Sequence, residues 1–320
     1  MGRYVLARLL SCVLTFFAIT LLVFIAFYAL PRPPQSAFRN RADNGHIHGS
    51  VAVGYARYVW AMVRYGDLGH SYTDRQDVRT KLMRAAPVTL SLILGGMFVW
   101  LIFAIPIGIV SALHPRSLLD RAGTVFILIG LCAHPLWLGL VLSYFFGRYL
   151  HVLPPAGYCS VNRVSTGCEG LSQWAYHLVL PWFTFGMVNA AFFAALVRAL
   201  VIEELGSEYV RTARAKGVGE RHILTRHLLK NVSLPLVTLL GIQLGTAIGT
   251  VVFIESAFDL PGLGGILRTA AVRRDLPTTA GSVVFLVVTV MFINLVVDLA
   301  YALVDPRIRL AGASPEPASA

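Results

Sequence analysis

Charged side chains are scarce in this chain of 320 residues, because Asp, Glu, Lys and Arg make up 13% of it and hydrophobic residues 56%. That balance leaves too little polar surface to cover a soluble globule, so water is not the main solvent of the folded chain. Lipid offers no partners to backbone N–H and C=O groups, so apolar segments within it form helices or a closed barrel. The apolar segments here are long enough for helices, each at or above the roughly 20 residues that cross a membrane.

Other absences exclude further classes of protein. No Gly-x-x-x-x-Gly-Lys-Ser/Thr loop occurs, so the chain has no evident means of binding ATP phosphates. The cores of the apolar stretches contain no Asp, Glu, Lys or Arg, which argues against a secondary transporter or a channel. No nucleophile–base pair or metal-ligand set appears, and His46 and His48 stand alone, so we expect neither an enzyme nor a metal site.

Six apolar stretches predict an all-α, polytopic membrane protein. The first follows two arginines, as a signal peptide would, but it ends at Pro31 without a small-x-small cleavage site and is interpreted as a retained helix. Residues 1–310 then form one transmembrane domain, with an outer loop at 31–86, an inner loop at 202–230 and a disordered tail at 311–320. The six expected helices lie at about 9–30, 87–113, 120–147, 172–200, 231–255 and 276–304.

The basic residues orient the chain. The net charge of +11 suggests nucleic acid at first, but the 27 Lys and Arg are scattered over loops with no recognised nucleic-acid motif. Outside the long loop 31–86, most of them flank the side that holds both termini. Positive charge in short loops marks the cytoplasmic side, so both termini are predicted to be cytoplasmic.

The longest inner loop, Ile202 to Lys230, predicts a helix, a turn at Gly217–Gly219 and a second helix. Small alanines flanked by basic residues suit entry into a groove on a soluble partner. The alternative is an amphipathic loop held against anionic lipid headgroups. The candidate docking residues are Glu208, Tyr209, Arg211, Thr212, Ala213, Arg214, Ala215, Lys216 and Gly217.

This segment, followed by Asn231–Pro235, resembles the cytoplasmic signature loop of the permease subunits of ABC importers. The general pattern has Glu-Ala-Ala where this chain has Arg211-Thr212-Ala213, as is usual in the dipeptide/oligopeptide branch. The segment 31–54 is shorter than usual for that branch and unlike it. Further matching pieces are Gly66–Ser71, Ala86–Leu90, Leu153–Tyr158, Glu255–Gly264, Asn294–Asp298 and Asp305–Arg309.

The resemblance implies a type I ABC importer permease fold in the inner membrane. It also implies a second permease chain, related in a heterodimer or identical, and an extracytoplasmic solute-binding protein. Two cytoplasmic ATPase subunits, or one fused ATPase, would bind ATP and Mg, so this chain needs no cofactor of its own. Di- or oligopeptides are the first choice of substrate, and nickel or glutathione are the alternatives within the same class.

Several residues outside the inner loop are further candidates. Asn189, Gln243 and Asn294 are polar residues inside apolar stretches, which either line the translocation path or bond across helices. Cys159 and Cys168 share an outer loop and are predicted to form a disulfide, with two free thiols as the alternative. A four-residue repeat of Gly241, Gly245 and Gly249 predicts close helix packing, tighter at Gly245 than at Gly281. The outer gate, facing the binding protein, is assigned to Glu255, Phe258, Pro261, Gly262 and Gly264.

Overall fold

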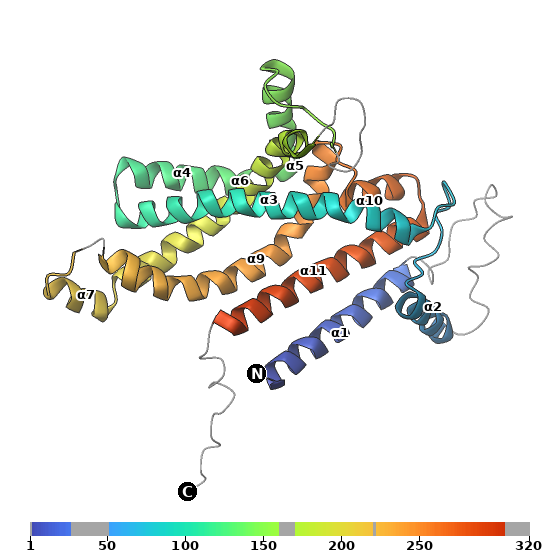
Figure 1. Cartoon of the computed structure of the whole chain (residues 1–320), viewed down its shortest axis with the longest axis horizontal. Coiled ribbons are helices and arrows are strands. Elements are labelled where there is room, and N and C mark those ends of the chain that lie inside the picture. The colour runs from blue at the N-terminus through green and yellow to red at the C-terminus, as the bar shows by residue number, and fades with distance from the viewer. Residues whose placement is uncertain (1, 27–50, 160–169, 220–221, 305–320) are drawn as a thin grey trace, which may run out of the picture. The chain divides into compact units, whose positions relative to one another are not determined.

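The computed structural model describes residues 2–26, 51–159, 170–219 and 222–304, and these ranges contain helices but no strand (Figure 1). The predicted all-α class is confirmed. Cys168, the tail 311–320 and much of the first half of the outer loop lie outside the described residues. The elements are α1 (Gly2–Phe24), α2 (Val51–Tyr65), α3 (Val78–Leu113), α4 (Leu118–Cys132), α5 (Pro135–Leu142), the π-helical η2 (Ser143–Tyr149), α6 (Gly170–Leu205), α7 (Glu208–Ala215), the π-helical η3 (Ile223–Leu228), α9 (Leu229–Ala257), α10 (Leu263–Val272) and α11 (Leu276–Val304).

Four helices among the described residues are long and apolar enough to cross a membrane. They lie in α3, α6, α9 and α11, and a bent pair made of α4 and α5–η2 brings the number to five if it counts as one span. The apolar part of α1, Leu10–Phe24, is shorter. The predicted count of six spans is therefore not fully reproduced within the described residues.

The third predicted span, 120–147, is not one straight helix. It breaks after Cys132, and the helices on either side are bent by 107°. Pro135 has no N–H and disfavours helical backbone at the residue before it, and both Ala133 and His134 adopt extended conformations. The ring nitrogen Nδ1 of His134 accepts a bond from the N–H of Leu136 at 3.3 Å, which caps the new helix.

The second predicted span begins earlier than expected. We expected a helix from residue 87 after an outer loop at 31–86, whereas α2 ends at Tyr65 and α3 begins at Val78. The carboxylate of Asp77 explains the early start, because it accepts bonds from the backbone N–H and the hydroxyl of Thr80 at 3.1 and 2.7 Å. This is an N-cap that the hydropathy pattern does not register.

The chain divides into two compact units. Unit 1 comprises Met1, Val88–Pro261 and Ile293–Ala320. Its centre is α6, which packs on α4, α5 and α9. Trp100 of α3 and Phe193 of α6 are both almost fully buried and meet edge to face at 5.4 Å. Figure 1 shows α7 joining α6 to α9 at the end of this unit far from α5.

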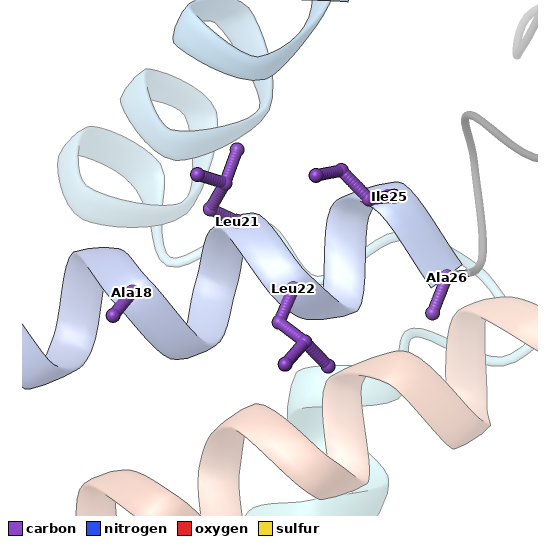
Figure 2. Close-up of a pocket in the computed structure, with 5 residues that line it drawn as sticks. All are labelled: Ala18, Leu21, Leu22, Ile25 and Ala26. Atoms are coloured by element: carbon purple, nitrogen blue, oxygen red, sulfur yellow. The ribbon is translucent and has the colours of Figure 1, made fainter.

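Unit 2 comprises Gly2–Pro87 and Gly262–Phe292. The buried apolar side chains Val23, Met62, Ala280 and Val284 form its core. A shallow pocket of about 360 Å³ runs along α1 and is lined only by apolar side chains (Figure 2). It offers no polar group to orient a solute, so it is not a candidate binding site.

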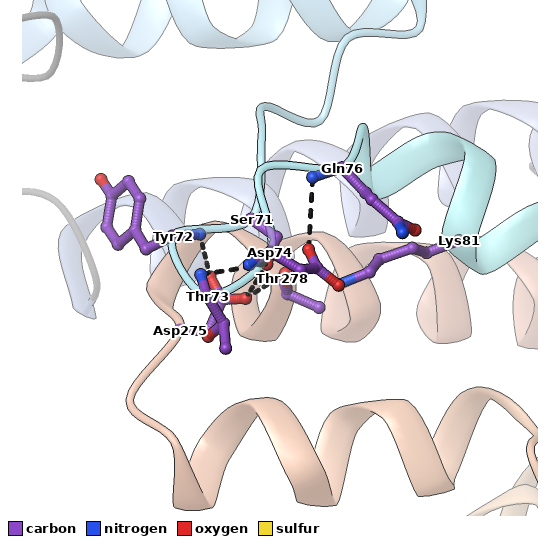
Figure 3. Close-up of polar contacts among 8 residues, drawn as sticks. All are labelled: Ser71, Tyr72, Thr73, Asp74, Gln76, Lys81, Asp275 and Thr278. Atoms are coloured by element: carbon purple, nitrogen blue, oxygen red, sulfur yellow. Dashed lines mark hydrogen bonds and ion pairs between the residues drawn. The ribbon is translucent and has the colours of Figure 1, made fainter.

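A polar cluster in unit 2 ties the loop before α3 to the start of α11 (Figure 3). The carboxylate of Asp275, only 3% exposed, accepts bonds from the hydroxyls of Ser71 and Thr278 at 2.5 and 2.7 Å and from the N–H of Tyr72 at 3.0 Å. These bonds replace the water that the buried charge has lost. At the rim, Lys81 pairs with Asp74 at 2.6 Å, and this contact lowers the pKa of Asp74.

Candidate functional site around α7

Local sequence signals set both ends of α7. Glu208 in its first turn and Arg214 in its last match the helix dipole. After Lys216 the chain turns at Gly217, whose φ is +76°, a conformation that glycine adopts without cost. The N–H of Gly217 bonds to the carbonyl of Arg214 at 2.9 Å and that of Val218 to the carbonyl of Ala213 at 3.1 Å. These two backbone hydrogen bonds form a Schellman motif, which confirms the predicted turn.

One buried side chain and one hydrogen bond to α6 hold α7 in place, and a second bond links the same α6 carboxylate to α9. Val210 is fully buried, whereas its neighbours in α7 are partly or fully exposed. The carboxylate oxygen Oε1 of Glu204, near the end of α6, accepts bonds from the hydroxyl of Tyr209 at 2.7 Å and from Nδ2 of Asn231 at 2.9 Å. Glu204 therefore joins α6, α7 and α9. Burial, and next the bond to Glu204, raise the pKa of Tyr209.

The rest of α7 presents a mixed, mainly basic surface. Arg211 pairs with Glu208 one turn earlier at 3.1 Å, and both side chains are well exposed. An exposed pair of this kind contributes little to stability. The small Ala213 and Ala215 lie between the longer side chains, Ala213 half-buried and Ala215 exposed. The predicted residues thus lie together on one short, anchored helix and the two residues after it, and most of them are exposed.

The three predicted path residues have different surroundings. Asn189 is 3% exposed, and its amide Nδ2 donates to the carbonyl of Phe185 one turn earlier at 2.8 Å, which favours a packing role. Gln243 is half-buried on α9. Oδ1 of Asn294 is buried without a hydrogen-bond partner among the described residues, and its side chain faces Gly245. The path assignment stays a prediction for all three.

The glycine contacts overturn the predicted ranking of Gly245 and Gly281. A Cβ atom at Gly245 would lie 3.1 Å from the flexible amide of Asn294. At Gly281 it would lie 2.8 Å from Cγ1 of Val78 and 3.4 Å from Cβ of Leu68. Nothing lies within 4 Å of such an atom at Gly249. Gly281 is the tighter position, because its neighbours are branched side chains from distant parts of the sequence.

The predicted outer-gate residues fall in two units and are described separately. In unit 1, Glu255 is fully buried and its Oε1 accepts a bond from the hydroxyl of Thr89 at 2.6 Å. Phe258 is also buried, and its carbonyl accepts a bond from the N–H of Gly157 at 2.9 Å, whereas Pro261 is exposed. In unit 2, Gly262 precedes α10 as its N-cap and Gly264 is buried within it. Their gating role stays a prediction.

Two further features bear on the sequence-based assignments. Cys159 is buried, but Cys168 lies outside the described residues, so their disulfide stays a prediction. Among the described residues no group of three or more His, Cys, Asp or Glu is placed to hold a metal ion.

One partly buried ion pair in unit 1 is absent from the sequence-based predictions. Arg198 of α6 meets the carboxylate of Asp120 of α4 at 3.1 Å. Asp120 begins the predicted span 120–147 and Arg198 lies near the end of the predicted span 172–200, and the sequence analysis gives neither residue a role. Their opposite signs near the ends of two predicted neighbouring helices were the available signal.

Comparisons with known proteins agree on one family. The family described as "Binding-protein-dependent transport system inner membrane component" matches residues 104–310. The dipeptide transport system permease protein DppB of Escherichia coli K12 is 30% identical, over 97% of this chain and 99% of that protein. The oligopeptide transport system permease protein AppB of Bacillus subtilis is 31% identical, over 96% and 99%.

A solved structure supports the fold. The MetNI methionine ABC transporter in an inward-facing conformation contains a chain that superposes with a TM-score of 0.56 and covers 70% of this chain and 96% of that one. The two are 19% identical, so the likeness concerns the fold alone.

Proposed function

The chain belongs to the family of binding-protein-dependent transport system inner membrane components, and from that premise we propose that it is a permease subunit of an ATP-driven importer of di- or oligopeptides. The observation that carries the proposal is the identity of 30–31% to peptide permeases over nearly the full length of both chains.

In this proposal α7 docks on a cytoplasmic ATPase subunit. Its fixed position between α6 and α9 favours this role, because the bonds of Glu204 to Tyr209 and Asn231 would pass movement of α7 to two long helices. A loop that only lay on lipid headgroups would need no such anchor. The proposal places α7 and both termini in the cytoplasm, in agreement with the distribution of Lys and Arg.

The remaining partners follow from the same proposal. A second permease chain would complete the translocation path, and an extracytoplasmic binding protein would deliver the substrate and supply most of the selection. ATP and Mg would bind to the ATPase subunits, since this chain has no phosphate-binding loop. We therefore expect the purified chain alone to hydrolyse no ATP.

Substrate uptake tests the proposal. We would measure uptake of a labelled dipeptide, of nickel and of glutathione into cells that produce the importer with and without this chain. The expected result is that dipeptide uptake depends on the chain and is reduced by excess unlabelled di- and tripeptides but not by free amino acids. Loss of nickel or glutathione uptake alone would favour those substrates instead, and unchanged uptake of all three would refute the proposal.

A further inference from the structure

The carboxylate of Asp120 joins three parts of unit 1. It is 8% exposed, and its Oδ1 accepts bonds from the hydroxyl of Ser111 at 2.5 Å and from Nη2 and Nε of Arg198 at 3.1 and 3.2 Å. Its Oδ2 accepts a bond from the N–H of Arg116 in the turn between α3 and α4 at 2.9 Å. Nε of Arg198 also donates to the hydroxyl of Ser111 at 3.1 Å. The three side chains form a closed triangle between α3, α4 and α6.

Close helix contacts surround this triangle. A Cβ atom on Gly108 of α3 would lie 2.6 Å from Cβ of Val197 in α6, next to Arg198. A Cβ atom on Gly123 of α4 would lie 3.3 Å from the hydroxyl oxygen of Ser111. Backbones that approach this closely leave little room for one helix to slide past another. The triangle therefore lies inside a tightly packed three-helix assembly.

The triangle lies near the base of α7. Arg198 is about two helical turns before the end of α6 at Leu205, and only Gly206 and Ser207 separate α6 from α7. Figure 1 shows the turn between α3 and α4 at the same end of unit 1 as α7. A displacement of α7 that moves the end of α6 must therefore either carry the α3–α4 hairpin with it or break the ion pair.

We propose that the Asp120–Arg198 ion pair is the positioning contact through which movement of α7 reaches the α3–α4 hairpin. The inference rests on the proposed function, since it assumes that an ATPase moves α7. The two residues touch neither nucleotide nor substrate, and they act by making the end of α6 and the hairpin move as one body.

A comparison of single and double variants of Asp120 and Arg198 shows whether the ion pair couples the helices or only stabilises the fold. Asp120→Asn keeps an oxygen for the N–H of Arg116 but leaves Arg198 without its counter-ion. Arg198→Gln instead leaves the carboxylate of Asp120 without its counter-ion. The side chains of Asp120 and Arg198 are 12% and 33% exposed, so a single change leaves a partly buried charge without its partner and should cost more stability than the loss of both charges. The double variant should thus recover thermal stability relative to the single variants. If the pair only stabilised the fold, transport would recover with it.

The experiment uses the whole importer in proteoliposomes. For wild type, both single variants and the double variant, we would measure ATPase co-purification, melting temperature, ATP hydrolysis and dipeptide uptake per ATP hydrolysed. We expect the double variant to keep the ATPase and its basal hydrolysis. Its uptake per ATP should fall at least about fivefold, the lower end of typical coupling between sites. The control pair is Asp74→Asn with Lys81→Gln, an ion pair in unit 2 that should leave this ratio unchanged.

Two results are decisive against the proposal. Normal uptake per ATP in the double variant would overturn it and leave the proposed function intact. If no ATPase co-purified with the wild-type chain, or if the wild-type importer showed no ATP-dependent uptake of dipeptide, the proposed function would be refuted and this inference with it.

Discussion

The contact between α4 and α6 at Gly130 gives a sharp test of the packing in unit 1. A Cβ atom at Gly130 would lie 2.3 Å from Cβ of Ala191, and neither atom can rotate away because both are fixed to the backbone. Carbon atoms pack best at about 3.5–4.0 Å, so Gly130→Ala requires the two helices to move roughly 1 Å further from each other. Overpacking of this kind costs about 1–3 kcal/mol.

Gly249→Ala is the matched control, because it is also a Gly-to-Ala change within an apolar helix and meets no atom within 4 Å. The gain in helix propensity is common to both variants and cancels in the comparison. Gly130→Ala should therefore be less stable than Gly249→Ala by about 1–3 kcal/mol. The assay is equilibrium unfolding of the isolated chain in mixed micelles with increasing SDS. Equal free energies of unfolding would show that the close approach of α4 and α6 does not exist in the protein.

Gly281→Leu should reduce the yield of folded chain more than Gly245→Leu, since the first meets branched side chains and the second a flexible amide; equal yields would contradict this. The raised pKa of Tyr209 means that the folded chain holds the phenol proton more tightly than the unfolded chain. The contribution of this residue to stability is thus complete below the ordinary pKa of 10.0 and is lost as pH rises above it. The Tyr209→Phe variant should therefore lose less stability than the wild type when the pH is raised above 10.0. An unchanged pH profile for this variant would argue against the anchor. Mass spectrometry of unreduced peptides should find Cys159 and Cys168 bridged, and two free thiols would remove that prediction.

Much of the α7 region could be predicted because its signals are local. Helix formers, basic side chains and Gly217 lie within a few residues of one another, and the structure shows the short helix and the left-handed glycine that they imply. The second half of the loop differs, since η3 runs directly into α9. Hydropathy locates the start of an apolar span less well than a surface turn, because polar residues in the first turns of a helix resemble a loop.

The features that sequence analysis missed depend on direction or on distant contacts. Hydropathy averages over a window and does not register a change of direction, so the bend before Pro135 was absorbed into one span, although the proline itself was a signal. The same averaging set Asp120 and Arg198 aside as charges at the ends of spans. The crowding at Gly281 comes from Val78 and Leu68, about 200 residues away in the sequence, and no local pattern encodes it.

A comparison of Gly217→Val with Gly157→Val tests whether α7 is the docking element for the ATPase. Both glycines have positive φ, +76° and +99°, and neither would bring a Cβ within 4 Å of another atom, so the local strain is similar. They differ in position, since Gly217 follows the end of α7 and Gly157 lies in the loop after η2.

Both variants should reach the membrane in equal amounts, because neither changes an apolar span. The measurement is the amount of ATPase that co-purifies with each. We expect a loss of at least about tenfold for Gly217→Val, which corresponds to 1.4 kcal/mol, and wild-type recovery for Gly157→Val. Equal recovery of the ATPase with both variants would show that α7 is not the docking element.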